Sequence, residues 1–415
     1  MTLRKTFALL LALLCIITAQ PALAAPQDEL CGKYKLVQVI VLSRHNIRAP
    51  IVGADSGLAK MTDHKWHDFG VKKGQLTAHG ALIERNIGAY FRQYLQQEGL
   101  FPAGYEFQSK DVFFYANSFQ RTIATARNFA LGMFPEADVK ITYTKQIDEA
   151  DPVFLPGAKN HKEAFNEACN QELQALGGSR GLAETIIPGV KTAAMVLDRP
   201  VVSLDDFSFT VKDGMHITGA ARPLMGACDA LVLQYYELGD KRASFGHELT
   251  FEEWQEIAAV KDLGVHAYRN IPTLSRALAR PLLSIFQEEL NTPQRKFTFL
   301  CGHDTNIAPV MAALEVKETH LPETIEQEAP IGCKLVIKEW EAQDGESYIT
   351  LQLVYPTTSQ LIAASPLTAD NPPEMIPLNL QNIQPNEDGL IAMQDFQQRL
   401  TDAITSDAEL MGLHY

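Results

Sequence analysis

The sequence predicts an α/β fold in which a mostly α-helical segment interrupts a larger α/β domain. Apolar runs at residues 36–42 and 296–301 suit buried parallel strands, and each is followed by a polar turn and then a helical pattern. From about 141 to 265 the pattern changes to polar helices, loops and single prolines. We therefore expect an α/β catalytic domain formed by residues 25–140 and 266–415, with residues 141–265 inserted as an α-helical cap domain.

The first 24 residues have the three parts of a secretory leader. Arg4 and Lys5 precede an apolar stretch at 7–18, and Ala22-Leu23-Ala24 follows it. The apolar stretch is shorter than the roughly 20 residues that a spanning helix needs. No later stretch is long and apolar enough to span a membrane. We expect cleavage of residues 1–24 as a signal peptide, and export of the mature protein to the periplasm.

The formal net charge is −14, so the surface repels nucleic acid and anionic membranes. We expect neither as a partner, and any anion site must be built locally from clustered arginines. An odd number of cysteines follows the leader, so at least one thiol is free or pairs between chains. The sequence therefore allows a homodimer. The sequence suggests that Cys301 and Cys333 are neighbours. The five cysteines are Cys31, Cys169, Cys228, Cys301 and Cys333.

The polar turn after the first apolar run carries the strongest chemical signal. It delivers Arg44, His45 and Arg48 together at the end of a buried strand, and Pro50 fixes the exit of the turn. Arginine is the side chain best shaped for bidentate contact with phosphate. An imidazole between two guanidinium groups stays neutral, because like charges disfavour its protonated form. A neutral imidazole beside an anion clamp is a nucleophile aimed at phosphorus.

Further along the α/β part we expect a helix at 78–97, with Leu82, Ile87 and Phe91 facing the core. A strand at 111–115 and a helix at 119–134 follow. Asn117 and Ser118 are good N-cap residues for that helix, and Arg121 lies in its first turn. A cation there is opposed by the helix dipole unless an anion binds at the same end. The helix has one apolar face: Ile123, Ala126, Ala130 and Phe134.

Within the inserted segment we expect helices at 164–176 and 222–237. A G-x-S-x-G pattern at 177–181 lacks the strand that a nucleophile elbow requires, so we interpret it as a loop. We expect a small hairpin at 201–209. In the preceding polar loop, His64 and His67 have a spacing that metal ligands can have, but no third ligand lies nearby in the sequence.

The second half repeats the strand, turn and helix. Gly302 to Asn306 follow the strand at 296–301, and the next helix carries apolar residues at helical spacing. Antiparallel strands are expected at 333–340 and 349–355, with a helix from about 390. Since the carboxyl ends of parallel strands meet at one edge of a sheet, the three turns should converge there. They would bring together Arg44, His45, Arg48, Arg121, His303 and Asp304.

Three segments resemble the histidine acid phosphatases. R-H-N-x-R-A-P at 44–50 has Asn46 where the family usually has glycine, and A-N-S-F-Q-R-T spans 116–122. L-Q-Y-Y-E at 233–237 and the Asn46 variant resemble the periplasmic branch that acts on glucose 1-phosphate. The resemblance implies a phosphoglycerate-mutase-like three-layer α/β/α domain with a helical cap. It also implies that Arg121 is a third phosphate-binding arginine and that Glu237 contacts substrate.

The hypothesis is hydrolysis of a small phosphomonoester through a phosphohistidine. His45 attacks phosphorus, the arginines and His303 hold the non-bridging oxygens, and Asp304 protonates the leaving alkoxide. Because the arginines offset the charge, no metal or cofactor is required, and no Walker loop or zinc-type cluster is found in the sequence. We expect Asn46 to narrow the space beside the nucleophile and so to favour a sugar phosphate.

Three alternatives stay open. One is a phytase or a broad-specificity acid phosphatase of the same fold. A phosphoglycerate-mutase-like transferase is disfavoured, because export removes the protein from glycolytic substrates. The third is a non-catalytic periplasmic binder of phosphate or sugar phosphate, which would use the same arginines but has no need for Asp304.

Overall fold

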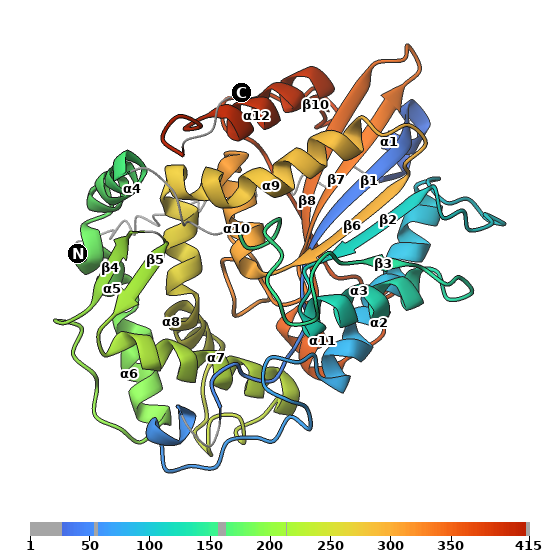
Figure 1. Cartoon of the computed structure of the whole chain (residues 1–415). Helices are drawn as coiled ribbons and strands as arrows, with labels where there is room; N and C mark the ends of the chain where they lie inside the picture. Colours follow the sequence, from blue (N-terminus) through green and yellow to red (C-terminus); the bar gives the residue numbers. More distant parts are fainter. Residues whose placement is uncertain (1–26, 54–56, 157–162, 213, 412–415) are drawn as a thin grey trace, which may run out of the picture.

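The computed structural model describes residues 27–53, 57–156, 163–212 and 214–411 (Figure 1). The predicted signal peptide at 1–24 lies outside these ranges. One mixed sheet dominates the described chain, in the order β10-β8-β7-β1-β6-β2-β3, with β9 paired to β8. Its strands are β1 Tyr34–Arg44, β2 Val112–Ala116, β3 Ile141–Thr142, β6 Phe297–Gly302, β7 Lys334–Ala342, β8 Ser347–Tyr355, β9 Glu374–Pro377 and β10 Ile391–Ala392.

Strand β1 lies at the centre of this sheet. It pairs in parallel with β6 from Val39 to Arg44, and antiparallel with β7 over nearly its full length. Beyond β6, strands β2 and β3 are also parallel, whereas β7 to β10 are antiparallel. The predicted strands at 36–42, 111–115 and 296–301 are therefore confirmed, and their carboxyl ends lie along one edge.

Helices cover both faces of the sheet, which gives the predicted three-layer α/β/α architecture (Figure 1). Alternate residues of β1 divide between two apolar clusters, as a strand buried on both faces requires. Val39 and Val41 pack on the side of α2 and α3, whereas Ile40 and Leu42 pack on the side of α9, α10 and α12. These helices are α2 Ala78–Gln97, α3 Gln120–Met133, α9 Pro272–Leu290, α10 Asp304–Ala313 and α12 Met393–Thr405.

The segment expected to form the cap contains mostly helices and one small two-stranded sheet. The predicted junctions fall inside elements, because β3 pairs with the main sheet and α8 runs through residue 265. The division into domains stays a prediction. The elements are α4 Glu163–Ala175, α5 Gly178–Thr185, α6 Ile187–Val196, β4 Ser208–Val211, β5 Met215–Thr218, α7 Ala221–Leu238 and α8 Phe251–Asn270. Short helices elsewhere are α1 Gln27–Lys33, a 3₁₀ turn at Leu58–Lys60 and α11 Thr358–Ala363.

Several local predictions are wrong, and each has a physical reason. Leu82 is 49% exposed, because it lies on the outer face of α2, opposite Ile83 and Ile87. The N-cap of α3 is Phe119, and the Asn117 side chain instead lies 2.8 Å from His303 Nε2. The G-x-S-x-G segment forms α5, where the Ser179 hydroxyl bonds to the backbone of Phe209.

Two further predictions need correction. The hairpin lies at β4 and β5, later than the predicted 201–209, and pairs Ser208 with Thr218. Cys301 and Cys333 lie on opposite sides of β1, so they are not neighbouring strand partners. Cys169, Cys228, Cys301 and Cys333 are buried thiols that form no disulfide. Among the described helices, none is long and apolar enough to cross a membrane.

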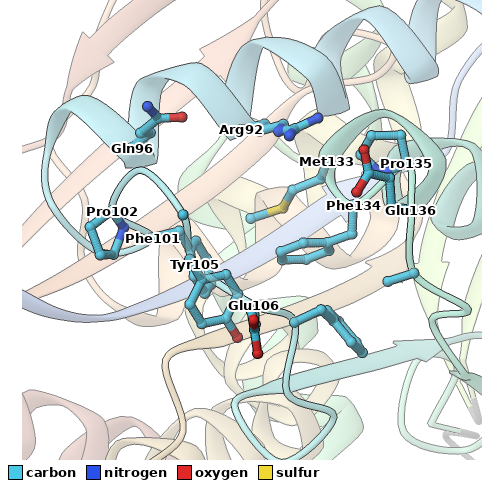
Figure 2. A pocket seen from close by; sticks show the side chains of 13 residues that line it. Arg92, Gln96, Phe101, Pro102, Tyr105, Glu106, Met133, Phe134, Pro135 and Glu136 are labelled. Carbon is cyan, nitrogen blue, oxygen red and sulfur yellow. The ribbon is translucent and has the colours of Figure 1, made fainter.

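The opposite, amino-terminal edge of the parallel strands carries an aromatic pocket of about 350 Å³ (Figure 2). Phe101, Tyr105 and Phe134 line it, with Arg92 and Glu106 among its polar residues. It lies between the carboxyl ends of α2 and α3 and the loop that precedes β2. None of the candidate catalytic residues contributes to it.

Candidate active site

The turns after β1, β2 and β6 are tied together by backbone hydrogen bonds. The His45 amide donates to the Gly302 carbonyl at 3.0 Å, and the Asn117 amide donates to the Cys301 carbonyl at 2.9 Å. These bonds extend the parallel pairing by one residue beyond each strand. The turns that carry His45, Arg121 and His303 therefore meet at one edge of the sheet, as the sequence predicts.

His45 is 3% exposed, and its ring is 5.4 Å from that of His303 between centroids. Its Nδ1 lies 2.9 Å from the carbonyl oxygen of Asn46. A carbonyl only accepts, so Nδ1 carries the proton and Nε2 holds the lone pair. Burial and the positive charge of Arg121 hold the pKa of His45 well below its ordinary value. The site thus contains a neutral imidazole whose lone pair is on Nε2.

His303 is fixed in the complementary tautomer. The Asn117 side-chain oxygen accepts from the amides of Ser118 and Asp151, so its NH₂ group must donate to His303 Nε2, at 2.8 Å. Burial, and then the charge of Arg121, lower the pKa of His303 to about 3. His303 is therefore neutral, with its proton on Nδ1 available as a donor.

Each of the three arginines is held by a different contact. Arg48 forms a bidentate pair with Asp229 at 3.0 Å for both bonds, from α7. Arg44 bonds Asp304 at 3.0 Å and Glu326 at 2.7 Å. The Arg121 guanidinium stacks 4.6 Å above the Phe119 ring, and burial together with the charge of Arg48 lowers the pKa of Arg121 to about 10. The Arg121 charge therefore persists at neutral pH.

The Nε atoms of Arg44, Arg48 and Arg121 are all buried without a hydrogen-bond partner in the described structure. A buried donor left unpaired costs about 1–3 kcal/mol, and such groups are rare in native proteins. Here three of them belong to the arginines that surround one neutral imidazole. Such an arrangement fits an oxyanion with several acceptor oxygens, such as a phosphoryl group.

Asp304 begins α10 and places its carboxylate beside Arg44. Burial acts to raise its pKa, but the charges of Arg44 and Lys261 outweigh it and hold the pKa of Asp304 well below its usual range. The carboxylate is 3.0 Å from Arg44 Nη2 and keeps partial access to solvent. Without a bound anion, Asp304 is therefore ionised.

Behind Arg44 lies a buried polar network that the sequence did not reveal. Glu326 accepts bonds from Arg44, Tyr236, Lys261 and the Ile331 amide. Burial acts to raise the pKa of Glu326, but the charges of Arg44 and Lys261 outweigh it and hold that pKa below its ordinary value. Glu326 is one of several acids in a loop, and Asp229 is one of two acids in α7, so no local pattern marks either residue as an arginine partner. Asn117 lies in the A-N-S-F-Q-R-T segment, but the sequence suggested only an N-cap role for its side chain.

Two residues that the sequence suggested for the substrate pocket, Glu237 and Asn46, have other contacts in the structure. Glu237 lies 3.7 Å from His79 Nδ1, and about 12 Å along α7 from Asp229, so its contacts do not join it to the cluster. Its contact with substrate stays a prediction. The expectation that Asn46 narrows the substrate space is wrong, because its side chain is wholly buried and bonds Glu84. His64 pairs with Asp198 and stacks on Phe245.

The fold and this site define a class of phosphoryl-transfer enzyme, and comparison with known proteins identifies it. Residues 35–354 match the model of the histidine phosphatase superfamily (branch 2). The chain therefore belongs to that family, the histidine acid phosphatases, which are phosphomonoesterases.

Individual relatives agree with this assignment. The chain is 30% identical to a glucose-1-phosphatase from Providencia rettgeri, over 96% of this chain and 99% of the relative. It is also 30% identical to a glucose-1-phosphatase from Salmonella typhimurium, over 89% and 93%. Its fold is similar to that of the Citrobacter braakii phytase, with a TM-score of 0.82 at 22% identity, over 89% of this chain and 98% of that one.

Proposed function

We propose that this protein hydrolyses sugar phosphomonoesters of the glucose 1-phosphate type through a phosphohistidine on His45. The observation that carries the proposal is the set of three buried, unpaired arginine Nε donors around the neutral His45 ring. The proposed active-site residues are His45 and Asp304 for the chemistry, and Arg44, Arg48, Arg121 and His303 for the phosphoryl oxygens.

In the first step His45 Nε2 attacks phosphorus in line, and the bond from phosphorus to the leaving oxygen breaks. The electron pair goes to that oxygen, which takes a proton from Asp304 and departs as an alcohol. The arginine donors and His303 Nδ1–H neutralise the charge that spreads over the non-bridging oxygens. In the second step water attacks the phosphohistidine and gives its proton to Asp304. Inorganic phosphate and neutral His45 are released.

Asp304 is ionised in the free protein, whereas the proposed acid role requires a protonated carboxyl group. Substrate binding accounts for the difference. A phosphoryl dianion neutralises the nearby cations that hold the pKa of Asp304 down. It also adds negative charge beside the carboxylate. Both changes raise the pKa of Asp304 in the complex. The productive complex therefore carries one proton, which the Asp304 carboxylate and the phosphoryl group share. Activity should therefore be highest in acid, where that proton is present and His45 is still neutral.

The preference for a sugar over a polyphosphorylated ring is supported by Asp229. Its carboxylate pairs with Arg48, and its side chain remains 19% exposed at the edge of the site. A carboxylate accepts hydrogen bonds from sugar hydroxyls, and it repels a second phosphate group. The two glucose-1-phosphatase relatives at 30% identity favour the same choice. Phytase activity is the second candidate, favoured by the fold of the Citrobacter braakii enzyme.

Comparing kcat/KM on glucose 1-phosphate and on phytate tests the substrate. We expect faster turnover of glucose 1-phosphate, and the reverse ranking would assign the protein to the phytases. Export to the periplasm belongs to the same proposal, and N-terminal sequencing of the mature protein tests cleavage after residue 24.

Trapping tests the chemistry. Rapid quenching of the wild type should yield an acid-labile, base-stable phosphoryl group, and His45→Ala should yield none and lose at least about 10⁴-fold in kcat. A binding protein would instead show no turnover in the wild type. It would also keep its phosphate affinity in His45→Ala.

A further inference from the structure

A buried ion pair lies directly beneath the nucleophile turn. Glu84 of α2 and Lys334 of β7 are both fully buried, and their charged atoms are 2.8 Å apart. A buried ion pair is seldom the most stable choice, since an apolar pair of similar volume is often as good. The pair therefore calls for an explanation other than stability.

Lys334 connects three parts of the site's scaffold. Its ammonium group donates to Ser43 Oγ at 3.0 Å and to the Gly332 carbonyl at 2.8 Å, and it forms an ion pair with Glu84 Oε1 at 2.8 Å. Ser43 immediately precedes Arg44, and the Gly332 amide donates to the His45 carbonyl at 3.3 Å. Lys334 thus fixes the backbone on both sides of the nucleophile turn.

Asn46 joins this pair to the nucleophile. Its side-chain NH₂ donates to the second oxygen of Glu84 at 2.9 Å, while its side-chain oxygen accepts from the Ile47 amide at 2.9 Å. Its own amide donates to Thr125 at 3.2 Å. The peptide that these bonds hold is the one whose carbonyl accepts from His45 Nδ1.

The space for this side chain depends on Gly332. That glycine has a positive φ of 69°, and a Cβ there would lie 2.6 Å from the side-chain nitrogen of Asn46, Nδ2. The asparagine and the glycine therefore fit together, and the amide is packed as well as hydrogen-bonded.

We propose that Asn46, held by the Glu84–Lys334 pair, is a positioning residue that aims His45 Nε2 at phosphorus. The proposal rests on the proposed function of His45 as nucleophile. The side chain acts through the backbone: it fixes the Asn46 carbonyl, which orients the imidazole and keeps its proton on Nδ1. Glu84 and Lys334 are the buried anchor of that carbonyl, and they do not bind substrate.

Asn46→Gly tests the proposal, since it removes the side chain and restores the residue usual in the family. A misplacement of the nucleophile lowers kcat by about 10- to 100-fold. The KM, and the inhibition constant of inorganic phosphate, should stay within about threefold, because the arginines are untouched. Single-turnover quenching should show slow formation of the phosphohistidine. Unchanged kcat in the variant would overturn the proposal, as would equal losses in kcat and phosphate affinity.

A second set of variants separates positioning from folding. Lys334→Met leaves Glu84 without its partner and should lower kcat. The double variant Glu84→Gln/Lys334→Met keeps an amide oxygen for Asn46 and should recover most of that loss. Lys338→Met is the matched control, because Lys338 forms the same kind of buried pair between β7 and Glu98 beside α2, at 2.7 Å. It should lower the melting temperature and leave kcat unchanged.

Two further outcomes are informative. If Lys338→Met lowers kcat as much as Lys334→Met, the pair beneath the turn is only structural and the proposal is wrong. If the wild type itself yields no phosphohistidine, the proposed function fails first. In that case Asn46→Gly has no phosphohistidine formation to slow, and the proposed positioning role is wrong as well.

Discussion

The cationic side chains at the two edges of the central sheet differ in whether their hydrogen-bond donors have partners. At the amino edge, Arg295 pairs with Glu289 at 3.0 Å and bonds the Val112 carbonyl, and Lys296 lies 3.4 Å from Asp111. At the carboxyl edge, Arg44, Arg48 and Arg121 are ion-paired or stacked, yet each keeps a buried Nε without a partner. Unsatisfied donors distinguish a site built for a ligand from a site built for stability.

The largest effect should come from removing one of these unsatisfied donors. Arg121→Ala should lower kcat on p-nitrophenyl phosphate by about 10²- to 10³-fold, because it removes a charge aimed at the transition state. Arg92→Ala is the matched control, an exposed arginine at the aromatic pocket of the other edge, and should change kcat by less than about twofold (Figure 2). Similar losses in both variants would erase the distinction between the edges.

The next effect is on stability in acid. The pKa of His303 is about 3 in the folded protein and about 6.5 in an unfolded chain, so the unfolded state binds the proton first. The contribution of His303 to stability is complete above pH 6.5 and is lost as the pH falls toward 3. Urea unfolding should show that the wild type loses about 3 kcal/mol more than His303→Asn between pH 7 and pH 4. Parallel curves for the two proteins would contradict this.

Inorganic phosphate should stabilise the protein by binding at the carboxyl edge of the sheet only. At 100 times its dissociation constant, inorganic phosphate should add about 2.7 kcal/mol to the free energy of unfolding, measured by urea titration. The gain should vanish in Arg121→Ala and persist in Arg92→Ala. Stabilisation that survives in Arg121→Ala would place the anion elsewhere.

The smallest effect should come from the aromatic pocket. The Tyr105 hydroxyl donates to Asp111 at 3.0 Å, so Tyr105→Phe should cost about 1 kcal/mol of stability and leave kcat unchanged. Thermal melts and steady-state rates measure both. A fall in kcat would show that the aromatic pocket affects catalysis at the other edge of the sheet.

The parts of this molecule that depend on local pattern could be predicted from the sequence. The helix at 78–97 has the bounds of α2, and the apolar strands carry their polar turns to one edge. Six candidate residues meet there because parallel strands end together. These predictions needed only side-chain periodicity and the direction of the strands.

The remaining parts depend on contacts between residues far apart in the chain. Asp229 and Glu326 reach the arginines from a helix and a loop that no local pattern joins to the turn. Ser179 shows a different failure, because its glycine-rich segment was interpreted as a loop but forms α5. Lys334 and Lys338 did carry a signal, because both lie in the predicted strand at 333–340 and a buried lysine needs a partner.

The position of β1 has a consequence for how this enzyme would lose activity. Residues 39–43 are bonded to a neighbouring strand on both sides, so their amides can exchange with deuterium only when the whole sheet separates. The reactive turn is continuous with that strand. Heat inactivation should therefore coincide with the loss of the far-ultraviolet circular dichroism signal.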